Sequence, residues 1–289
     1  MSDSRGLIEP VATVDVKGIK CGEVPMFLIC GPCVIEEDAT MKQAAETLTR
    51  VQENLGIPII YKSSFQKDNR SAGENYRGPG LEKGLRVLED IGRDYGFPLL
   101  SDIHYPDQVD EAADVLDIIQ VPAFLCMQTD LAEKTALTQK VVNIKHGQFL
   151  APENMELPVE KIKRMGNDRI MVTERGYSFG YNDLIVDPRS FYLMRQIGYP
   201  VIFDITHSVR RYGIPSADPK GGNREFLSVL ARSAVGAGVD GLFIESHPNP
   251  PEAWCDAASQ LWLSDLEEFL KPLLEINAVI KERNSGTIH

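Results

Sequence analysis

The sequence predicts an α/β protein folded as a (β/α)8 (TIM) barrel with an N-terminal β-hairpin. Eight short apolar segments alternate with helical segments along the 289-residue chain, and this alternation is typical of parallel strands joined by helical crossovers. The strand candidates are continuously apolar, which indicates a sheet covered on both faces. Eight such units in roughly 260 residues fit a closed barrel better than an open sheet.

The first 25 residues predict a separate small element. Val11 to Gly22 have the alternation of a β-hairpin around a Lys17-Gly18 turn, and we expect this hairpin to cap the bottom of the barrel. The barrel is expected over residues 26–283 as one domain, because no linker rich in Pro, Gly or Ser interrupts it. Residues 284–289 are expected to form a disordered tail.

The predicted strands and helices follow one another in regular order. The strand candidates are Met26–Cys30, Pro58–Tyr61, Pro98–Leu100, Ile118–Val121, Val141–Ile144, Ile170–Val172, Val201–Phe203 and Gly241–Ile244. The helical segments carry apolar residues at helical spacing, and one of them opens with a proline, which suits a first helical turn. They are Asp38–Leu55, Leu81–Tyr95, Pro106–Val115, Thr129–Thr138, Val159–Met165, Pro188–Ile197, Arg224–Ala237 and Leu263–Glu282.

The composition argues against two classes of partner. With 42 acidic and 30 basic residues, the formal net charge is −12, whereas nucleic acid or an anionic membrane requires a basic face. No apolar run has the length of a membrane span. The five cysteines are an odd number, which favours a reducing compartment over a disulfide framework. Because the N-terminus also lacks a signal-peptide pattern, we expect the cytoplasm.

Polar groups follow every predicted strand, at the end where such a barrel carries its catalytic residues. This pattern predicts an enzyme. A basic set on this acidic protein suits phosphate or carboxylate groups of a small substrate. Two alternatives are a solvated surface loop after the second strand and salt bridges inside the barrel. The basic set comprises Lys62, Lys67, Arg70, Lys145 and Arg175.

A second set of strand-end residues suits a metal ion. Cys33, His207 and Glu245 follow strands one, seven and eight, which become neighbours when the barrel closes. Thiolate, imidazole and carboxylate are ligands of divalent transition metals. The alternative is an unligated Cys33 thiol with His207 as a lone proton carrier. We expect the remaining cysteines to be structural and three further histidines to be hydrogen-bonded groups around the site. These are Cys21, Cys30, Cys126 and Cys255, and His104, His146 and His247.

Several segments match one family in the same order along the chain. They are Gly31–Glu36, Lys62–Lys67, Asn69–Ser71, Gln120–Leu125, Lys145–Phe149, Thr173–Gly176, Phe203–Ser208 and Gly241–Glu245. From Phe27 to Leu261 the chain resembles the 3-deoxy-D-manno-octulosonate 8-phosphate synthases.

This resemblance implies a (β/α)8 enzyme, usually a homotetramer, that condenses phosphoenolpyruvate with D-arabinose 5-phosphate and water and releases phosphate. It implies that Asn69, Arg70 and Ser71 hold the sugar phosphate. The groups implied to hold phosphoenolpyruvate are Lys62, Ser64, Lys67, Gln120, Lys145 and Arg175, and we add Ala123 and Gln148 as substrate contacts. The residues expected to act in catalysis are Cys33, Lys62, Asp102 and His207.

The family divides into metal-dependent members with Cys at the position of Cys33 and metal-independent members with Asn there. This chain resembles the metal-dependent branch, which implies a divalent ion (Fe, Mn, Co or Zn). Its implied ligands are Cys33, His207, Glu245 and Asp256. The chain departs from the family at Gln66 and Asp68, and Cys255-Asp256-Ala257-Ala258 stands in place of the usual Ser-Asp-Gly. Residues 210–220 match poorly, and we expect a mobile loop that closes over the site.

Two alternative functions share much of this pattern. A related synthase uses erythrose 4-phosphate on the same kind of barrel and metal site, but it typically carries a Lys-Pro-Arg-Thr motif. Here the segment reads Lys67-Asp68-Asn69-Arg70-Ser71, which favours arabinose 5-phosphate. A non-catalytic sugar-phosphate-binding barrel should have lost a metal ligand or a phosphate-binding cation, and the sequence retains them all.

Overall fold

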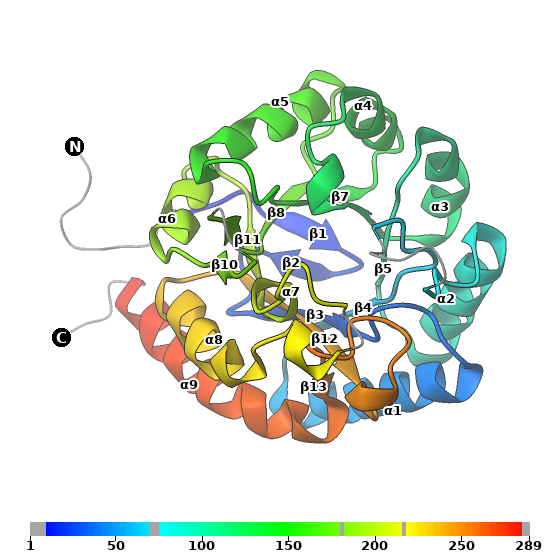
Figure 1. Cartoon of the computed structure of the whole chain (residues 1–289). Coiled ribbons are helices and arrows are strands. Elements are labelled where there is room, and N and C mark those ends of the chain that lie inside the picture. Colours follow the sequence, from blue (N-terminus) through cyan, green and yellow to red (C-terminus); the bar gives the residue numbers. More distant parts are fainter. Residues whose placement is uncertain (1–9, 70–74, 180–181, 216–217, 285–289) are drawn as a thin grey trace.

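Eight parallel strands close into a barrel in the computed structural model, which describes residues 10–69, 75–179, 182–215 and 218–284. The strands pair in the order β3-β4-β5-β6-β7-β8-β11-β12, and pairing of β12 with β3 completes the ring. Figure 1 shows the helices surrounding it. The predicted fold class is confirmed. The strands are β3 (Phe27–Gly31), β4 (Ile59–Lys62), β5 (Leu99–Asp102), β6 (Ile118–Val121), β7 (Val141–Lys145), β8 (Ile170–Glu174), β11 (Val201–Asp204) and β12 (Gly241–His247).

Seven of the eight barrel strands extend further toward their carboxyl ends than the apolar pattern predicted, whereas β6 matches its prediction, Ile118–Val121. β5 runs to Asp102 rather than Leu100, and β12 runs to His247 rather than Ile244. The polar residues at these ends still take part in the strand ladder; Asp102, for example, is in register with Gln120 of β6. The side chains of Asp102 and Glu245 therefore project from strands rather than from loops.

Two of the predicted helices, α1 (Asp38–Leu55) and α2 (Leu81–Tyr95), match the structure residue for residue. Three others begin three residues later than predicted, because a single 3-10 turn precedes the α-helical part at Pro106–Gln108, Arg224–Phe226 and Leu263–Asp265. The helix predicted to begin at Val159 begins earlier, at Glu156. The last helix continues to residue 284, so this residue is not part of the predicted tail, and the rest of the tail lies outside the described residues. The six helices that correspond to the remaining predicted segments are α3 (Val109–Val115), α4 (Thr129–Leu137), α5 (Glu156–Arg164), α6 (Arg189–Arg195), α8 (Leu227–Gly236) and α9 (Leu266–Asn284).

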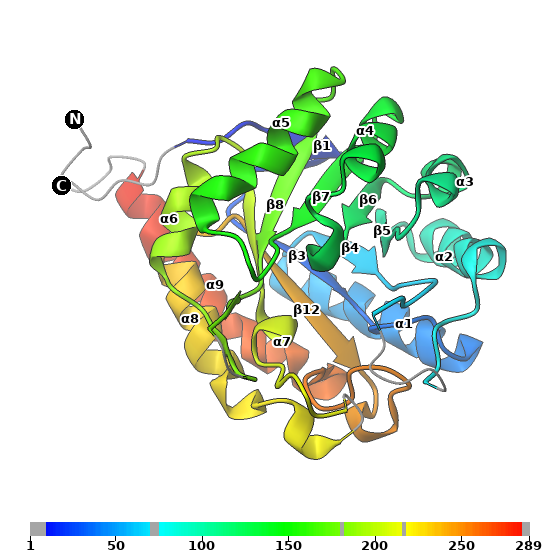
Figure 2. The same ribbon diagram turned by 45° about the horizontal axis from the view of Figure 1, so that its top comes forward.

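The N-terminal hairpin closes the amino-terminal end of the barrel. Strands β1 (Val14–Val16) and β2 (Ile19–Cys21) pair antiparallel around Lys17 and Gly18, both of which have positive φ, as a tight hairpin turn requires. The buried side chains of the hairpin form one apolar cluster with strand residues such as Phe27, Ile118 and Val141. Figure 2 shows β1 and α7 (Ile205–Ser208) at opposite ends of the barrel.

Short elements that the sequence pattern did not reveal lie among the loops. They are α7, which directly follows β11, and the strands β9 (Tyr177–Ser178), β10 (Leu184–Ile185) and β13 (Leu261–Trp262). Each is too short to give a periodic signal. Among the described residues, no helix combines the length and apolar character needed to span a membrane.

At the carboxyl end of β3 the backbone approaches that of β4 closely, which brings the polar segments after these two strands side by side. Gly31 has φ 153°, and a Cβ atom there would lie 2.1 Å from the carbonyl oxygen of Lys62. Only glycine tolerates this approach. Beyond it, the Ser64 amide donates to the Cys33 carbonyl at 3.3 Å, so the segments after β3 and β4 remain joined outside the barrel.

Candidate active site

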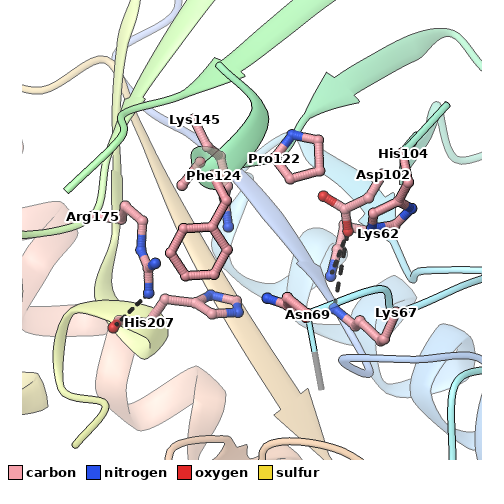
Figure 3. Close-up of a pocket in the computed structure, with 11 residues that line it drawn as sticks. Lys62, Lys67, Asn69, Asp102, His104, Pro122, Phe124, Lys145, Arg175 and His207 are labelled. Atoms are coloured by element: carbon pink, nitrogen blue, oxygen red, sulfur yellow. Dashed lines mark hydrogen bonds and ion pairs between the residues drawn. The ribbon is translucent and has the colours of Figure 1, made fainter. Parts of the chain in front are cut away.

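The carboxyl ends of the strands surround a polar pocket (Figure 3). Residues predicted from separate strand ends meet here, including Asn69 and Ala123 of the substrate-binding set. Arg70 and Ser71, which the resemblance assigned to the sugar phosphate, lie outside the described residues. The pocket is lined by Lys62, Lys67, Asn69, Asp102, His104, Pro122, Ala123, Phe124, Lys145, Arg175 and His207.

Three lysines of the pocket are buried and paired with carboxylates. Lys62 Nζ lies 2.6 Å from Glu245 Oε1, and Lys67 Nζ lies 3.7 Å from the same oxygen. Both ammonium groups are within 4 Å of Asp102 Oδ2, at 3.8 and 3.9 Å. Lys145 forms an ion pair with Asp204. The lysines thus form salt bridges inside the barrel and at the same time line the pocket.

The acidic and basic groups of this network shift one another's pKa values, because each charge stabilises the charged form of its partner. Burial by itself would raise the pKa of Glu245, but His207, Lys62 and Lys67 lower it to about 2. In the same way the lysines outweigh burial at Asp102 and hold its pKa below its usual range. Burial lowers the pKa of Lys145, with Asp204 opposing this effect. The pocket therefore presents ionised groups at neutral pH.

Arg175 differs from the lysines because two of its nitrogen atoms donate hydrogen bonds to neutral oxygens. Its Nη1 donates to the Tyr212 hydroxyl at 2.8 Å and its Nη2 to the His207 carbonyl at 3.1 Å. Its Nε is buried and finds no hydrogen-bond partner among the described residues. Gln148, another predicted substrate contact, donates to the same Tyr212 hydroxyl at 2.7 Å. The guanidinium is thus available for the planar, two-point recognition of an anion.

A chain of buried hydrogen bonds starts at Asp102 and links four neighbouring strands, β5 to β8. Gln120 donates to Asp102 Oδ1 at 2.5 Å, Asn143 donates to Gln120 at 2.8 Å, and Thr173 donates to Asn143 at 2.8 Å. An ionised carboxylate only accepts hydrogen bonds, so Gln120 must turn its amide nitrogen toward it. Asn143 must then turn its own amide nitrogen toward the Gln120 side-chain oxygen. Ser64 donates to the other carboxylate oxygen at 2.5 Å.

The four predicted metal ligands lie together at the edge of the pocket. Asp256 Oδ2 is 3.6 Å from Cys33 Sγ and 3.5 Å from His207 Nε2. His207 Nε2 is also 3.6 Å from Glu245 Oε2. Separations of this size are too long for good hydrogen bonds between nitrogen and oxygen. Each of these pairs is spaced like two atoms bound to one metal ion at bond lengths of about 2.0–2.3 Å. The ligand atoms fall into two groups that share Asp256: Cys33 lies in one of them, and His207 and Glu245 lie in the other.

These donors fit a divalent transition metal. Glu245 Oε2, which faces His207, is buried and has no hydrogen-bond partner among the described residues. His207 Nδ1 lies 2.8 Å from Asp204 Oδ2, and such a carboxylate behind a histidine orients it as a ligand. Burial raises the pKa of the Cys33 thiol well above its usual value, and Cys255 adds to this effect. A bound cation would favour the thiolate instead.

The remaining histidines lie around the site rather than within the ligand cluster. His247 Nε2 is 3.1 Å from Glu36 Oε2, and His146 Nε2 is 2.9 Å from the Leu150 carbonyl. Burial lowers the pKa of His104 to about 4, so its ring is neutral at neutral pH. His146 and His247 thus have the polar contacts expected from the sequence, whereas His104 lines the pocket itself and its buried Nδ1 has no hydrogen-bond partner among the described residues.

Sequence reasoning missed three residues that touch the predicted site. Asn143 interrupts the apolar run Val141–Ile144, and this polar residue within a buried strand was an available signal. Thr173 carries no such signal, because threonine is common in strands. Tyr212 belongs to the poorly matching segment 210–220, where the described part contacts Arg175 and Gln148 through the tyrosine hydroxyl.

Comparison with known proteins agrees with this geometry. Residues 10–282 match the model of the DAHP synthetase I family. A protein named 2-dehydro-3-deoxyphosphooctonate aldolase from Geotalea daltonii is 48% identical over 272 residues, which cover 94% of this chain and 100% of that protein. Proteins with the same name from Syntrophotalea carbinolica and Acidithiobacillus ferrooxidans are each 50% identical over 260 residues; these cover 90% of this chain and 94% and 92% of the respective relatives. The chain therefore belongs to the DAHP synthetase I family and, within it, to the group of the 2-dehydro-3-deoxyphosphooctonate aldolases.

Proposed function

We propose that this enzyme condenses phosphoenolpyruvate with D-arabinose 5-phosphate and water to give 3-deoxy-D-manno-octulosonate 8-phosphate and phosphate. One observation carries the proposal: buried Lys62, Lys67, Lys145 and Arg175 line a pocket beside a Cys, His, Glu and Asp cluster. Two phosphorylated substrates, one of which also bears a carboxylate, require such a concentration of cations on an acidic chain.

Phosphoenolpyruvate would lie between Arg175 and the lysines. Two nitrogen atoms of Arg175 donate hydrogen bonds to neutral oxygens of the protein. Neutral oxygens are weaker acceptors than a phosphate or carboxylate. Lys145 lies at 3.8 Å from the centre of the Phe243 ring, which fixes its ammonium group at the base of the pocket. Asn69 lines the other side, where the Asn69–Ser71 motif would hold the phosphate of the sugar.

The reaction forms a bond between C3 of phosphoenolpyruvate and the aldehyde carbon of the sugar. Water adds at C2, and phosphate leaves from C2 to produce the ketone. Charge moves toward the aldehyde oxygen as the new bond forms, so preorganised positive groups there lower the barrier. Lys62 remains charged for this purpose: burial lowers its pKa, but Glu245 and Asp102 outweigh burial and raise it. Asp102 also aligns Ser64 and Gln120 by accepting their hydrogen bonds.

We further propose that Cys33, His207, Glu245 and Asp256 hold a divalent ion, which would polarise the aldehyde oxygen of the sugar when bound. The sulfur, nitrogen and oxygen donors support Fe(II), Mn(II), Co(II) or Zn(II). Asp204 would keep His207 oriented as a ligand through the 2.8 Å contact with its Nδ1.

Exposed apolar side chains follow β7 and β8 and would suit packing between subunits of the homotetramer that the resemblance implies. Phe149, Phe179 and Ile185 are 62%, 71% and 50% exposed, and a hydrogen bond from the Ser178 amide to the Gln148 carbonyl joins two of their segments. We propose that subunits pack through these side chains in the cytoplasm. Sedimentation should find four times the chain mass of 32.1 kDa, and a monomer at micromolar concentration would contradict the assembly.

Phosphate release from phosphoenolpyruvate tests the activity directly. We expect D-arabinose 5-phosphate to support turnover and erythrose 4-phosphate to give a rate at least about tenfold lower, because the Asn69–Ser71 motif differs from that of the erythrose enzymes. Removal of metal with a chelator should abolish turnover, and Mn(II) or Fe(II) should restore it. Equal rates with both sugars would refute the substrate assignment, whereas full activity of the folded, metal-free protein would refute the metal proposal.

Removal of the Arg175 guanidinium should weaken phosphoenolpyruvate binding. In Arg175→Ala we expect a loss of about 1.5–3 kcal/mol for a charged hydrogen-bonding group, or roughly 10- to 150-fold in Kd, measured by calorimetry. The matched control is Arg189→Ala, because Arg189 has an 85% exposed side chain paired with Asp187. A change below about threefold in Arg175→Ala would show that this arginine is structural.

A further inference from the structure

The hydroxyl of Tyr212 is the point at which two predicted substrate-binding side chains meet. Arg175 follows β8 and donates from Nη1 to this oxygen at 2.8 Å, and Gln148 follows β7 and donates from Nε2 to it at 2.7 Å. Arg175 and Gln148 are each only 4% exposed. Tyr212 itself comes from the segment after α7, in which the resemblance assigns no binding residue.

The hydrogen bonds of Arg175 leave donors for an anion. A guanidinium carries five N–H donors in a fixed plane. Nη1 uses one of them on Tyr212, and Nη2 uses one on the His207 carbonyl at 3.1 Å, a contact drawn in Figure 3. Nε is buried and has no partner among the described residues. Two oxygens from the protein thus hold the plane, and the other N–H groups suffice for two-point recognition of a phosphate or carboxylate.

Tyr212 is itself held in place by its backbone and its ring. The Tyr212 amide donates to the Asn182 carbonyl at 2.8 Å. Its ring meets the ring of Phe124 edge-on, with the two centroids 6.5 Å apart, and Phe124 lines the pocket. The guanidinium carbon of Arg175 lies 5.9 Å from the centre of the Tyr212 ring, within the range of a cation–π contact. The hydroxyl is therefore a supported group rather than the tip of a free side chain.

An alternative is that Tyr212 occupies the place of the anion and must leave when substrate binds. The donors that remain on Arg175 argue against this, because the anion can bind them without breaking the contact with Tyr212. Gln148 argues against it too. Its Oε1 is buried and already has no hydrogen-bond partner among the described residues, so departure of the tyrosine would leave both polar atoms of this amide unsatisfied, at a cost in free energy.

We propose that Tyr212 is a positioning residue for phosphoenolpyruvate, whose hydroxyl holds the Arg175 guanidinium and the Gln148 amide in the orientation that receives the anion. This inference rests on the proposed function and extends it to a residue outside the motifs of the resemblance. Tyr212 stays in place when substrate binds, and it acts mainly through Arg175 rather than on the reacting atoms. Loss of its hydroxyl therefore weakens substrate binding and leaves the chemical step unchanged.

Calorimetric titration of phosphoenolpyruvate tests the role of the hydroxyl. In Tyr212→Phe we expect Kd to rise at least about fivefold, because a hydrogen bond to a charged group no longer orients the guanidinium. Tyr212→Ala should lose a similar amount, since the hydroxyl rather than the ring positions Arg175. The matched control is Tyr192→Phe, because Tyr192 is a 48% exposed tyrosine on α6, and it should bind as the wild type does. Circular dichroism checks that each variant is folded. Wild-type or tighter binding in Tyr212→Phe would overturn the inference, even if Tyr212→Ala binds weakly.

A double-mutant cycle distinguishes positioning from a general structural role. When Tyr212→Phe is added to Arg175→Ala, its cost should fall below about twofold, because the residue through which it acts is gone. The same loss in both backgrounds would overturn the inference.

Steady-state kinetics give a second readout. In Tyr212→Phe the KM for phosphoenolpyruvate should rise, while kcat and the KM for D-arabinose 5-phosphate stay within about twofold of the wild type. A fall in kcat with an unchanged KM would contradict positioning. Absence of phosphoenolpyruvate binding by the wild type would refute the proposed function itself, whereas wild-type binding that Tyr212→Phe does not weaken would refute this inference alone.

Discussion

The carboxylate of Glu245 is the group on which the whole pocket depends. Its Oε1 lies 2.6 Å from Lys62 and 3.7 Å from Lys67, whereas its Oε2 lies 3.6 Å from His207. Each of these side chains would be costly to bury with an uncompensated charge. Because β12 presents one carboxylate to both sides, the lysines of the pocket and the proposed metal ligand His207 can both remain in contact with it within the barrel.

This shared carboxylate makes the two halves of the site electrostatically dependent on each other. A cation bound beside Oε2 would offset part of the negative charge that Glu245 presents to the lysines. The lysines would then attract an anionic substrate more strongly. An anionic substrate on the lysines in turn leaves Glu245 more available to a cation. Such coupling between two ligands is necessarily reciprocal in free energy. It gives a physical reason for placing the cations of the pocket and the proposed metal ligands on neighbouring strands.

The sequence was sufficient to predict the features that repeat along the chain. Continuous apolar strands between amphipathic helices predict a closed barrel, and closure alone makes the ends of β3, β11 and β12 neighbours; this is why Cys33, His207 and Glu245 could be grouped in advance. Other features depend on three-dimensional register. Whether Asn143 reaches Gln120, and whether Cys255 faces Cys33, is determined by side-chain direction within the closed barrel and by the left-handed turn at Asp256. Neither leaves a periodic pattern in the sequence.

The coupling through Glu245 is tested most directly by calorimetric titration of phosphoenolpyruvate into metal-free and Mn(II)-loaded protein under otherwise identical conditions. The account predicts tighter binding to the loaded protein by at least about fivefold, the lower end of typical coupling energies. It also predicts that phosphoenolpyruvate increases the affinity for Mn(II) by the same factor. Equal phosphoenolpyruvate affinity with and without metal would contradict the claim that one buried carboxylate joins the two sites.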